Sequence, residues 1–272
     1  MLVSENITEV KKVGVVGVGF VGDTVYKYFV NRGISMCSYD KHKFIGCFED
    51  ILSAEILFLC LPTPYVKDVG FDLSSIEETC NKLSSEKFEG IVVLKSTVTP
   101  GTTLYLSKKY GLDICHNPEF LTMRTKDEDF KNQKQIVLGY TSQQGSFEKV
   151  VEFYKKLFPL SELSICSSCE SESMKIFCNS FYAVKVQFFN ELFLLCKKLK
   201  IDFESVKKMM LKNGWINPMH TMVPGPDGQL SYGGACFPKD TNALNRFMIN
   251  SETPNLVLEA TIKEKERFRD DS

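Results

Sequence analysis

Residues 12–40 hold the sequence feature that most restricts the fold of this chain. A short apolar run, residues 12–16, leads into the glycine-rich turn Gly17-Val18-Gly19-Phe20-Val21-Gly22. Apolar residues then recur at helical spacing, and a second apolar run, residues 34–39, ends in Asp40. A strand, a GxGxxG turn, a helix, a strand and an acid about twenty residues on together form the dinucleotide-binding fingerprint.

The three glycines of this turn have separate tasks. Gly17 makes the turn, Gly19 lets a pyrophosphate approach the backbone, and Gly22 lets the helix pack on the strand. The helix N-terminus then faces the phosphates with unpaired N–H groups. Asp40 is expected to accept hydrogen bonds from the adenosine ribose, which favours NAD over NADP, although Lys41 and Lys43 would soften that preference. A glycine-rich turn in an unrelated sheet is the alternative.

Apolar runs continue to alternate with helical patterns up to residue 168, which predicts an α/β fold with a doubly wound, mostly parallel sheet. We expect strands at residues 56–61, 90–94, 112–115 and 135–139, a last edge strand at 163–166, and helices at 74–83 and 147–157. Polar loops follow three of the strands, at residues 61–64, 95–102 and 116–120. Open α/β sheets bind ligands at the carboxyl ends of their strands, so these loops are expected to form the binding edge. We therefore assign residues 1–168 to an NAD-binding, Rossmann-like domain.

The pattern becomes helical in residues 169–272, which we assign to a second domain. Residues 172–200 lack Gly and Pro and predict one long helix, on which Glu172, Lys175 and Asn179 share a face with Ala183, Val186 and Asn190. A second helix is expected at residues 202–212, followed by a long loop at 213–232. A final helix is expected to begin with Thr253 as N-cap and Pro254 at its first position, and to run to about residue 268. A solvated polar stripe is the alternative for the shared face.

Composition excludes several classes of function. The 272 residues carry a net charge of −1, and no basic run stands out, so we expect no nucleic-acid partner. No apolar segment is long enough to span a bilayer, which predicts a cytoplasmic protein without a membrane partner. Most of the ten cysteines lie in apolar runs, as small hydrophobic residues of a reducing compartment do. The lone CxxC pair, Cys166 and Cys169, has no second pair, so we expect no metal site.

The stretch Gly233-Gly234-Ala235-Cys236-Phe237-Pro238-Lys239-Asp240 is the strongest candidate for chemistry. Two glycines let the backbone turn and approach a ligand, and Lys239 is a possible source of the positive charge that makes a thiol nucleophilic. Taken alone, the stretch also fits a buried cysteine in a turn beside a surface ion pair. Only the rest of the chain favours the nucleophile.

In their order along the chain, the motifs resemble those of the UDP-glucose/GDP-mannose dehydrogenase family. The matching pieces are residues 17–22, 61–64, 95–102 and 117–121, the set Glu172-x-x-Lys175-x-x-x-Asn179, and residues 233–240. They cover nearly the whole chain, and the last motif, with its cysteine, is the most specific. The resemblance implies an NAD-dependent, twofold oxidation that takes the C6 alcohol of UDP-glucose to UDP-glucuronate, a step of polysaccharide biosynthesis.

The resemblance also implies residue roles. Cys236 would attack the C6 aldehyde to give a thiohemiacetal, hydride loss would leave a thioester, and water would cleave it. Lys175 would stabilise oxyanion charge, and Asp240 with Thr97 would position and activate water. The catalytic set is Cys236, Lys175, Asp240, Asn179, Thr97 and Glu119; the cofactor set is Gly17, Gly19, Phe20, Val21, Gly22, Asp40, Lys41, Pro62, Thr63, Thr97 and Lys239; the substrate set is Glu119, Phe120, Leu121, Lys175, Asn179 and Gly233.

Two departures from the family pattern stand out. Family members often carry a second glutamate where this chain has Met123, which puts the base for thioester hydrolysis in question. The family also has a further α/β domain that closes over the nucleotide, whereas this chain ends at Ser272, so we expect a short form without it. The loop at residues 221–230 or a partner chain would then have to compensate.

Several alternatives stay open at this point. GDP-mannose or another nucleotide sugar could replace UDP-glucose as the substrate. A β-hydroxyacid dehydrogenase also pairs a GxGxxG domain with a Lys-x-x-x-Asn helix, but has no use for Cys236. The third hypothesis is a cofactor-binding module that has lost catalysis and acts in an assembly. The final helix exposes Leu256, Val257, Ala260 and Ile262, which predicts a homodimer built partly on that helix.

Overall fold

The structure is a computed structural model that describes residues 10–142 and 145–269 of the chain. The chain divides into two compact units. The first comprises residues 1–63 and 72–174, and the second comprises residues 64–71 and 175–272. The chain therefore leaves the first unit briefly at residue 64, contributes a short hairpin to the second, and returns.

A mixed β-sheet forms the centre of the first unit. In spatial order its strands are β2 (Met36–Tyr39), β1 (Val13–Val16), β3 (Ile56–Leu59), β6 (Ile91–Leu94), β7 (Ile114–His116), β8 (Gln135–Tyr140) and β9 (Glu162–Ser167). Strands β2, β1, β3, β6 and β7 are parallel, and β8 runs antiparallel to β7. The strand order reverses beside β1, because β2 and β3 flank it on opposite sides, and this switch point is where doubly wound sheets bind ligands.

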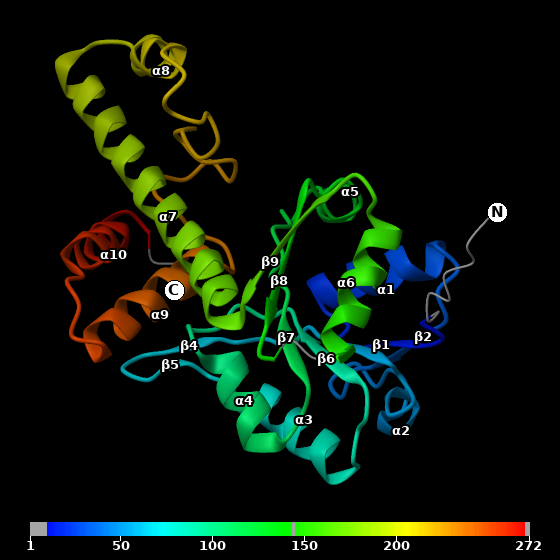
Figure 1. The fold of residues 1–272 in the computed structure, drawn as a ribbon. Coiled ribbons are helices and arrows are strands. Elements are labelled where there is room, and N and C mark those ends of the chain that lie inside the picture. The colour runs from blue at the N-terminus through cyan, green and yellow to red at the C-terminus, as the bar shows by residue number, and fades with distance from the viewer. Residues whose placement is uncertain (1–9, 143–144, 270–272) are drawn as a thin grey trace. The chain divides into compact units, whose positions relative to one another are not determined.

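Helices cover both faces of this sheet (Figure 1). One face carries α1 (Phe20–Asn31), α5 (Lys126–Lys131) and α6 (Gly145–Leu157), and the other carries α2 (Phe48–Ile51), α3 (Ser74–Ser85) and α4 (Thr102–Tyr110). The first face has an aromatic core in which Phe29 lies 5.5 Å from Phe58 and 5.1 Å from Phe153, measured between ring centroids. The buried strands, apolar on both sides, explain why their sequences read as continuous apolar runs.

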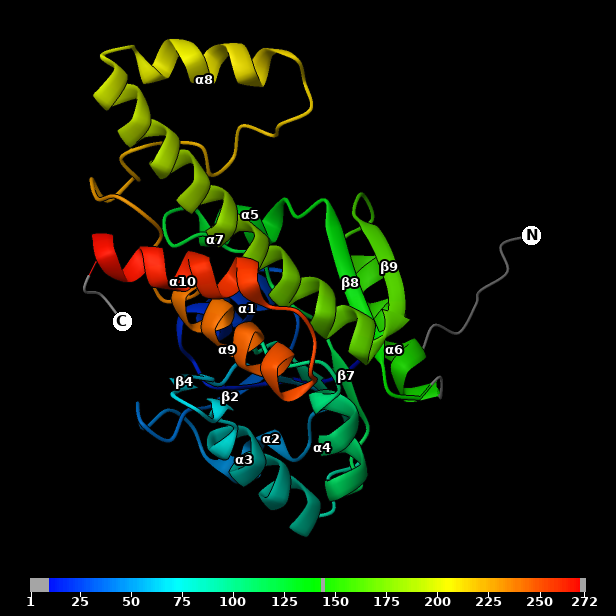
Figure 2. The ribbon, with the colours of Figure 1, turned by 90° about the vertical axis from the view of Figure 1, so that its left-hand side faces the viewer.

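The second unit is mainly helical. It contains most of α7 (Ser168–Leu199), with α8 (Phe203–Lys212), α9 (Phe237–Asn250) and α10 (Leu256–Phe268). A two-stranded hairpin, β4 (Tyr65–Val66) with β5 (Gly70–Phe71), packs against α9. Helices α9 and α10 lie side by side (Figure 2). The loop at residues 213–236 returns the chain from α8 to α9, and Val223 in this loop packs with Phe189 and Phe203.

The predicted fold class is confirmed, but two predictions about the last helices need correction. The expected N-cap Thr253 does not start the final helix, which begins at Leu256 after Asn255. Thr253 instead donates its backbone N–H and its hydroxyl to Met248 O, and so completes the end of α9. Helix α9 itself was not predicted, because Gly233, Gly234 and Pro238 suggest a turn; Pro238 in fact lies in the first turn of α9, where proline is tolerated.

None of the helices among residues 10–142 and 145–269 combines the length and the apolar character needed to cross a membrane. Helix α7, at 32 residues, is long enough, but polar and charged residues recur along it.

Candidate active site

The glycine turn after β1 has the geometry that a dinucleotide needs. Gly17 has φ +85°, and a side chain there would lie 2.6 Å from Cys60 O. A Cβ on Gly22 would lie 1.9 Å from Gly17 O, so helix α1 could not pack so closely with any other residue. A Cβ on Gly19 would meet nothing within 4 Å, and Gly19 is the N-cap of α1, which has no side-chain cap. The first amides of α1 are thus open to an anion such as a pyrophosphate.

Asp40 is buried, and its carboxylate shapes the neighbouring loop. One oxygen accepts from Val18 N at 2.8 Å, and the other accepts from His42 N at 3.0 Å and Lys43 N at 2.9 Å. Burial alone would raise the pKa of Asp40, but these backbone donors and the Lys43 charge hold it below its ordinary value. The carboxylate therefore stays ionised and holds the glycine turn, at Val18, next to the loop at residues 42–43. Its hydrogen bond to a ribose stays a prediction.

A cavity of about 240 Å³ opens beside this turn, at the carboxyl ends of β1, β2 and β3. Gly17, Gly19, Asp40 and Lys41 line it together with Pro62. Lys41 forms an ion pair at 2.7 Å with Glu78 of α3, which also lines the cavity. Its place at the switch point, its open glycine and its apolar walls fit the adenosine half of NAD. The residues present therefore fit that cofactor.

The loops after β3 and β6 are tied to each other. Thr63 Oγ1 donates to Thr97 O at 2.8 Å, and Ser96 Oγ donates to Leu61 O at 2.6 Å. Two predicted cofactor residues, Thr63 and Thr97, are therefore hydrogen-bonded to each other at the carboxyl edge of the sheet. Sequence patterns could not show this bond because it joins residues from separate loops.

The fully buried carboxylate of Glu172 holds the far end of the loop after β6, at residues 101–103. Glu172 Oε2 accepts from Gly101 N at 2.6 Å, and Oε1 accepts from Thr103 N at 2.6 Å and Thr103 Oγ1 at 2.5 Å. These donors lie at the start of α4, where backbone amides have no partner in the helix. Burial raises the pKa of Glu172 despite these bonds. Glu172 is thus an anchor for the loop that carries Thr97.

The loop after β7 rests on a buried polar network. Lys95 Nζ donates to Asn117 Oδ1 at 2.6 Å, Tyr154 OH donates to the same oxygen at 2.6 Å, and Asn117 Nδ2 donates to Val137 O at 2.8 Å. Glu119 Oε2 then accepts from Leu121 N at 2.6 Å. The network fixes Asn117, and through it the predicted substrate residues that follow. The roles of Lys95 and Tyr154 were missed, since a lysine at a strand end carries no distinguishing pattern.

In the second unit, the predicted nucleophile lies at the start of a helix. Cys236 is exposed and occupies the N-cap position of α9. Asp240, one turn into the helix, is completely buried. Its carboxylate accepts from Asn179 Nδ2 at 2.6 Å and from Lys239 Nζ at 2.5 Å. Three predicted site residues thus meet around one carboxylate, and the open helix end next to Cys236 favours negative charge on sulfur.

The loop before Cys236 is held by polar residues of α7. Ser231 has the left-handed φ of +61°, is buried, donates its N–H to Asn190 Oδ1 at 2.9 Å and donates its hydroxyl to Gln187 Oε1 at 2.6 Å. These bonds hold a strained residue two positions before Gly233. Earlier in the same loop, the His220 ring stacks on Tyr182 at 4.6 Å between ring centroids. Burial, followed by the Lys185 charge, lowers the pKa of His220. Of these residues, only Asn190 had a sequence signal, from its place on the predicted shared face of α7.

The face of α7 predicted from helical spacing is buried. Glu172, Lys175, Asn179, Ala183 and Asn190 are each at most 5% exposed. A solvated polar stripe is therefore wrong for this helix. Thr97 and Glu119 belong to the first unit, whereas Asn179, Cys236 and Asp240 belong to the second. That both groups serve one substrate stays a prediction.

The cysteines differ in how far they are exposed. All ten lie within the described residues, and none of them forms a disulfide. Cys80 and Cys115 are fully buried among apolar side chains, and burial raises the pKa of each thiol to about 12. Cys47, Cys169 and Cys236 are exposed. This agrees with the use of most cysteines as small hydrophobic residues.

Residues 47–158 match the UDP-glucose/GDP-mannose dehydrogenase family, NAD binding domain, and residues 169–266 match the central domain of the same family. The chain is 31% identical over 254 residues to a UDP-glucose 6-dehydrogenase of Rickettsia bellii, across 89% of this chain and 55% of that protein. It is 31% identical over 214 residues to a GDP-mannose 6-dehydrogenase of Azotobacter vinelandii, across 72% of this chain and 47% of that protein. A UDP-glucose dehydrogenase structure from Pyrobaculum islandicum superposes with a TM-score of 0.86 at 24% identity, across 98% of this chain and 70% of that one.

The fold, the glycine turn and the matched binding domain define a protein of the NAD-binding dehydrogenase class, and NAD is the cofactor that this match indicates. The chain belongs to the UDP-glucose/GDP-mannose dehydrogenase family, because the two domain matches together take in more than half of it. The predicted family and fold class are therefore confirmed. The chain spans about half the length of the curated relatives it matches.

Proposed function

We propose that this chain carries out the NAD-dependent oxidation of a nucleotide sugar at C6, with UDP-glucose as the first candidate substrate and UDP-glucuronate as the product. The observation that carries the proposal is the group at the start of α9. An exposed thiol at the helix N-cap stands one turn from a buried carboxylate, which an amide and an ammonium hold in place. A thiol, a cation and a carboxylate are the parts that covalent acyl chemistry needs.

The chemistry follows from these parts. One NAD bound at the glycine turn would accept the hydride of the first oxidation, and a second NAD, bound there after NADH leaves, would accept the hydride of the second. After the first, the Cys236 sulfur adds to the aldehyde carbon, and the resulting thiohemiacetal loses a second hydride to become a thioester. Water then attacks the thioester carbonyl, the C–S bond breaks, and the carboxylate and the free thiol are released. Lys175 would stabilise the oxyanion that forms in each addition.

Asp240 is the proposed base for the water. Its two oxygens accept from Asn179 and Lys239, so the carboxylate has a fixed orientation one helical turn after Cys236. Lys239 also lies 4.6 Å from the Phe71 ring centroid, which restrains the ammonium from a second side. Met123 is 75% exposed and supplies no base, so we propose that hydrolysis is the slow step.

The test is to mix the purified chain with NAD and UDP-glucose and to follow NADH absorbance. Intact-protein mass spectrometry should show an adduct of one sugar nucleotide on the wild type and none on Cys236→Ser. A Cys169→Ser variant, which removes another exposed thiol, is the matched control and should keep both signals. If no nucleotide sugar yields NADH although NAD binds, the chain is a cofactor-binding module. Substrate preference is read by comparing UDP-glucose with GDP-mannose in the same assay.

We also propose that the chain forms a homodimer through exposed apolar residues of its helices. Phe177, Phe181 and Phe188 are 52–62% exposed on α7, and Leu256 and Val257 are 75% and 68% exposed on α10. The three phenylalanines recur at helical spacing and so lie on one face. An uncovered apolar stripe of this kind usually marks an interface. Sedimentation at micromolar concentration should give a dimer, and Phe181→Glu should shift it to monomer.

A further inference from the structure

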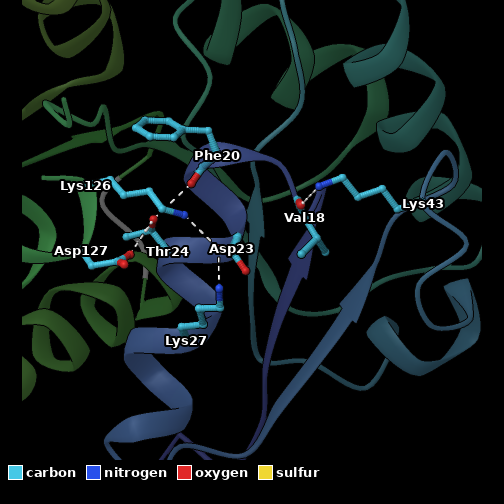
Figure 3. Close-up of polar contacts among 8 residues, drawn as sticks. All are labelled: Val18, Phe20, Asp23, Thr24, Lys27, Lys43, Lys126 and Asp127. Atoms are coloured by element: carbon cyan, nitrogen blue, oxygen red, sulfur yellow. Dashed lines mark hydrogen bonds and ion pairs between the residues drawn. The ribbon is translucent and has the colours of Figure 1, made fainter. Parts of the chain in front are cut away.

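Helix α5 is attached to the first turn of α1 by two consecutive side chains (Figure 3). Lys126 Nζ forms an ion pair with Asp23 Oδ2 at 2.9 Å. The Thr24 hydroxyl is shared between two acceptors, Asp127 Oδ1 at 3.2 Å and Phe20 O at 3.1 Å. The Lys126 ammonium also lies 5.6 Å from the Phe20 ring centroid. These contacts join residues more than a hundred positions apart in the sequence, so they are tertiary and not local.

The attached part of α1 is the part that faces the cofactor. Phe20 begins the helix at the open end of the glycine turn, and Asp23 lies in the same first turn. Asp23 Oδ2 has a second partner at 2.9 Å, Lys27, which lies one turn further along α1 and is mostly exposed. Lys27 and Lys126 thus contact the same oxygen, one within α1 and one from α5. The ion pair with Lys126 is the better shielded, with side chains 25% and 27% exposed.

At its other side, α5 is fixed to the loop that carries Glu119. Asp129 in α5 accepts from Thr122 N at 2.8 Å, from Thr122 Oγ1 at 2.9 Å and from Thr125 Oγ1 at 2.9 Å. Glu119 in turn accepts from Leu121 N. The loop at residues 117–125 and α5 are therefore held together by several bonds. A shift of α5 against α1 would move the loop.

We propose that Lys126 and Asp127 latch the Glu119 loop onto the first turn of α1, so that a dinucleotide at that turn sets the position of Glu119. The proposal rests on the proposed function, because it assigns the loop to the substrate. A pyrophosphate at the start of α1 adds negative charge to the turn that holds Asp23, which strengthens its hold on Lys126. By linkage, loss of the latch weakens dinucleotide binding by the same factor that the dinucleotide tightens the latch.

The test is hydrogen exchange of the amides at residues 117–125, with and without NAD and without substrate. Lys126→Gln breaks the latch, whereas Lys27→Gln removes the other partner of the same Asp23 oxygen and is the matched control. We expect Lys126→Gln to speed exchange in this loop and to abolish its slowing by NAD. Its NAD dissociation constant, measured by calorimetry, should rise by about 2- to 5-fold, the range for a partly shielded pair. Lys27→Gln should match the wild type.

The Asp23→Asn variant distinguishes two explanations of an effect of Lys126 on NAD binding. One is the latch through Asp23, and the other is direct electrostatic attraction between Lys126 and the phosphates. It removes a negative charge near the phosphates, so a purely electrostatic account predicts tighter NAD binding and an unchanged loop. The latch predicts that Asp23→Asn speeds hydrogen exchange in the loop as much as Lys126→Gln does. It also predicts that combining the two substitutions speeds the exchange no further. Equal loop exchange in Lys126→Gln and Lys27→Gln, with or without NAD, would overturn the proposal even if NADH is formed. Loop slowing by NAD in a chain that oxidises no nucleotide sugar would leave the latch standing and refute only the function.

Discussion

Glu172 and Asp240, the two completely buried carboxylates among the residues that the structure describes, are stabilised in different ways. Glu172 is surrounded by neutral donors, namely two backbone amides and a hydroxyl at the start of α4. Asp240 accepts from an ammonium and an amide. Neutral donors only partly offset the loss of hydration, and burial accordingly raises the pKa of Glu172. The comparison suggests that the Glu172 region serves structure, and that the Asp240 region, beside an exposed thiol, serves chemistry.

The largest expected effect belongs to Asp240→Asn. It keeps the shape of the side chain but removes the charge and the proposed base, so kcat should fall by about 10²–10⁴-fold. The measurement is steady-state NADH formation, with mass spectrometry to detect an accumulated thioester. Stability in urea should fall as well, by about 1–3 kcal/mol, because an amide accepts at one oxygen only and one of the two donors loses its partner. The rate is therefore measured on folded protein, where the loss of kcat is separate from the loss of stability. An active Asp240→Asn enzyme would end the distinction between the two regions.

Lys175→Ala sharpens the comparison, because Lys175 lies on α7 between Glu172 and Asn179. As the proposed oxyanion stabiliser, it should behave like the Asp240 region, with kcat lower by about 10²–10³-fold. Lys208→Ala on α8 is a control at a surface position. If Lys175→Ala lowers the free energy of unfolding but leaves kcat unchanged, Lys175 has a structural role like that of Glu172.

Glu172→Gln tests the structural side. The amide can accept at one oxygen only, so the donors at Gly101 N and Thr103 can no longer all be satisfied. We expect a loss of about 1–3 kcal/mol in the free energy of unfolding, measured by urea denaturation. A rate loss as large as that of Asp240→Asn, with unchanged stability, would contradict this.

The smallest effect is the pH dependence of the stability that Glu172 contributes. Its pKa in the folded chain lies above the ordinary value, so the folded state binds the proton more tightly than the unfolded state. This contribution is fully present below the unfolded pKa of about 4.3, and is lost as the pH rises through the higher folded pKa. The stability of the wild type relative to Glu172→Gln should therefore fall across this window in urea titrations. A difference that rises with pH would show that the pKa is lowered.

The sequence alone predicted those parts of the fold that follow from local patterns. The glycine turn and Asp40 lie within one strand–helix–strand unit, so their spacing identifies them. The long helix α7 and the shared face of its polar residues follow from spacing for the same reason, whereas the burial of that face is shown only by the structure. Helix α9 was missed because its start contains the Gly and Pro that usually mark a turn.

Contacts between distant residues could not be predicted. Asn179 and Asp240 are 61 residues apart, and nothing in either segment specifies the partner of its side chain. The position of Asp40 predicts an acid at the ribose, which stays a prediction, and it does not predict the three backbone bonds that the carboxylate accepts. The residues around Lys126 carry no motif at all, and their role depends on how α5 packs on α1.

The burial of Cys80 and Cys115 has a practical consequence for labelling experiments. A thiol with a pKa of about 12 is almost entirely protonated near neutral pH, and alkylating reagents react with the thiolate. Brief treatment with iodoacetamide therefore spares these positions and modifies the exposed Cys47, Cys169 and Cys236 first. With Cys47 and Cys169 replaced by serine, the alkylation rate would report on Cys236 and on whatever ligand shields it.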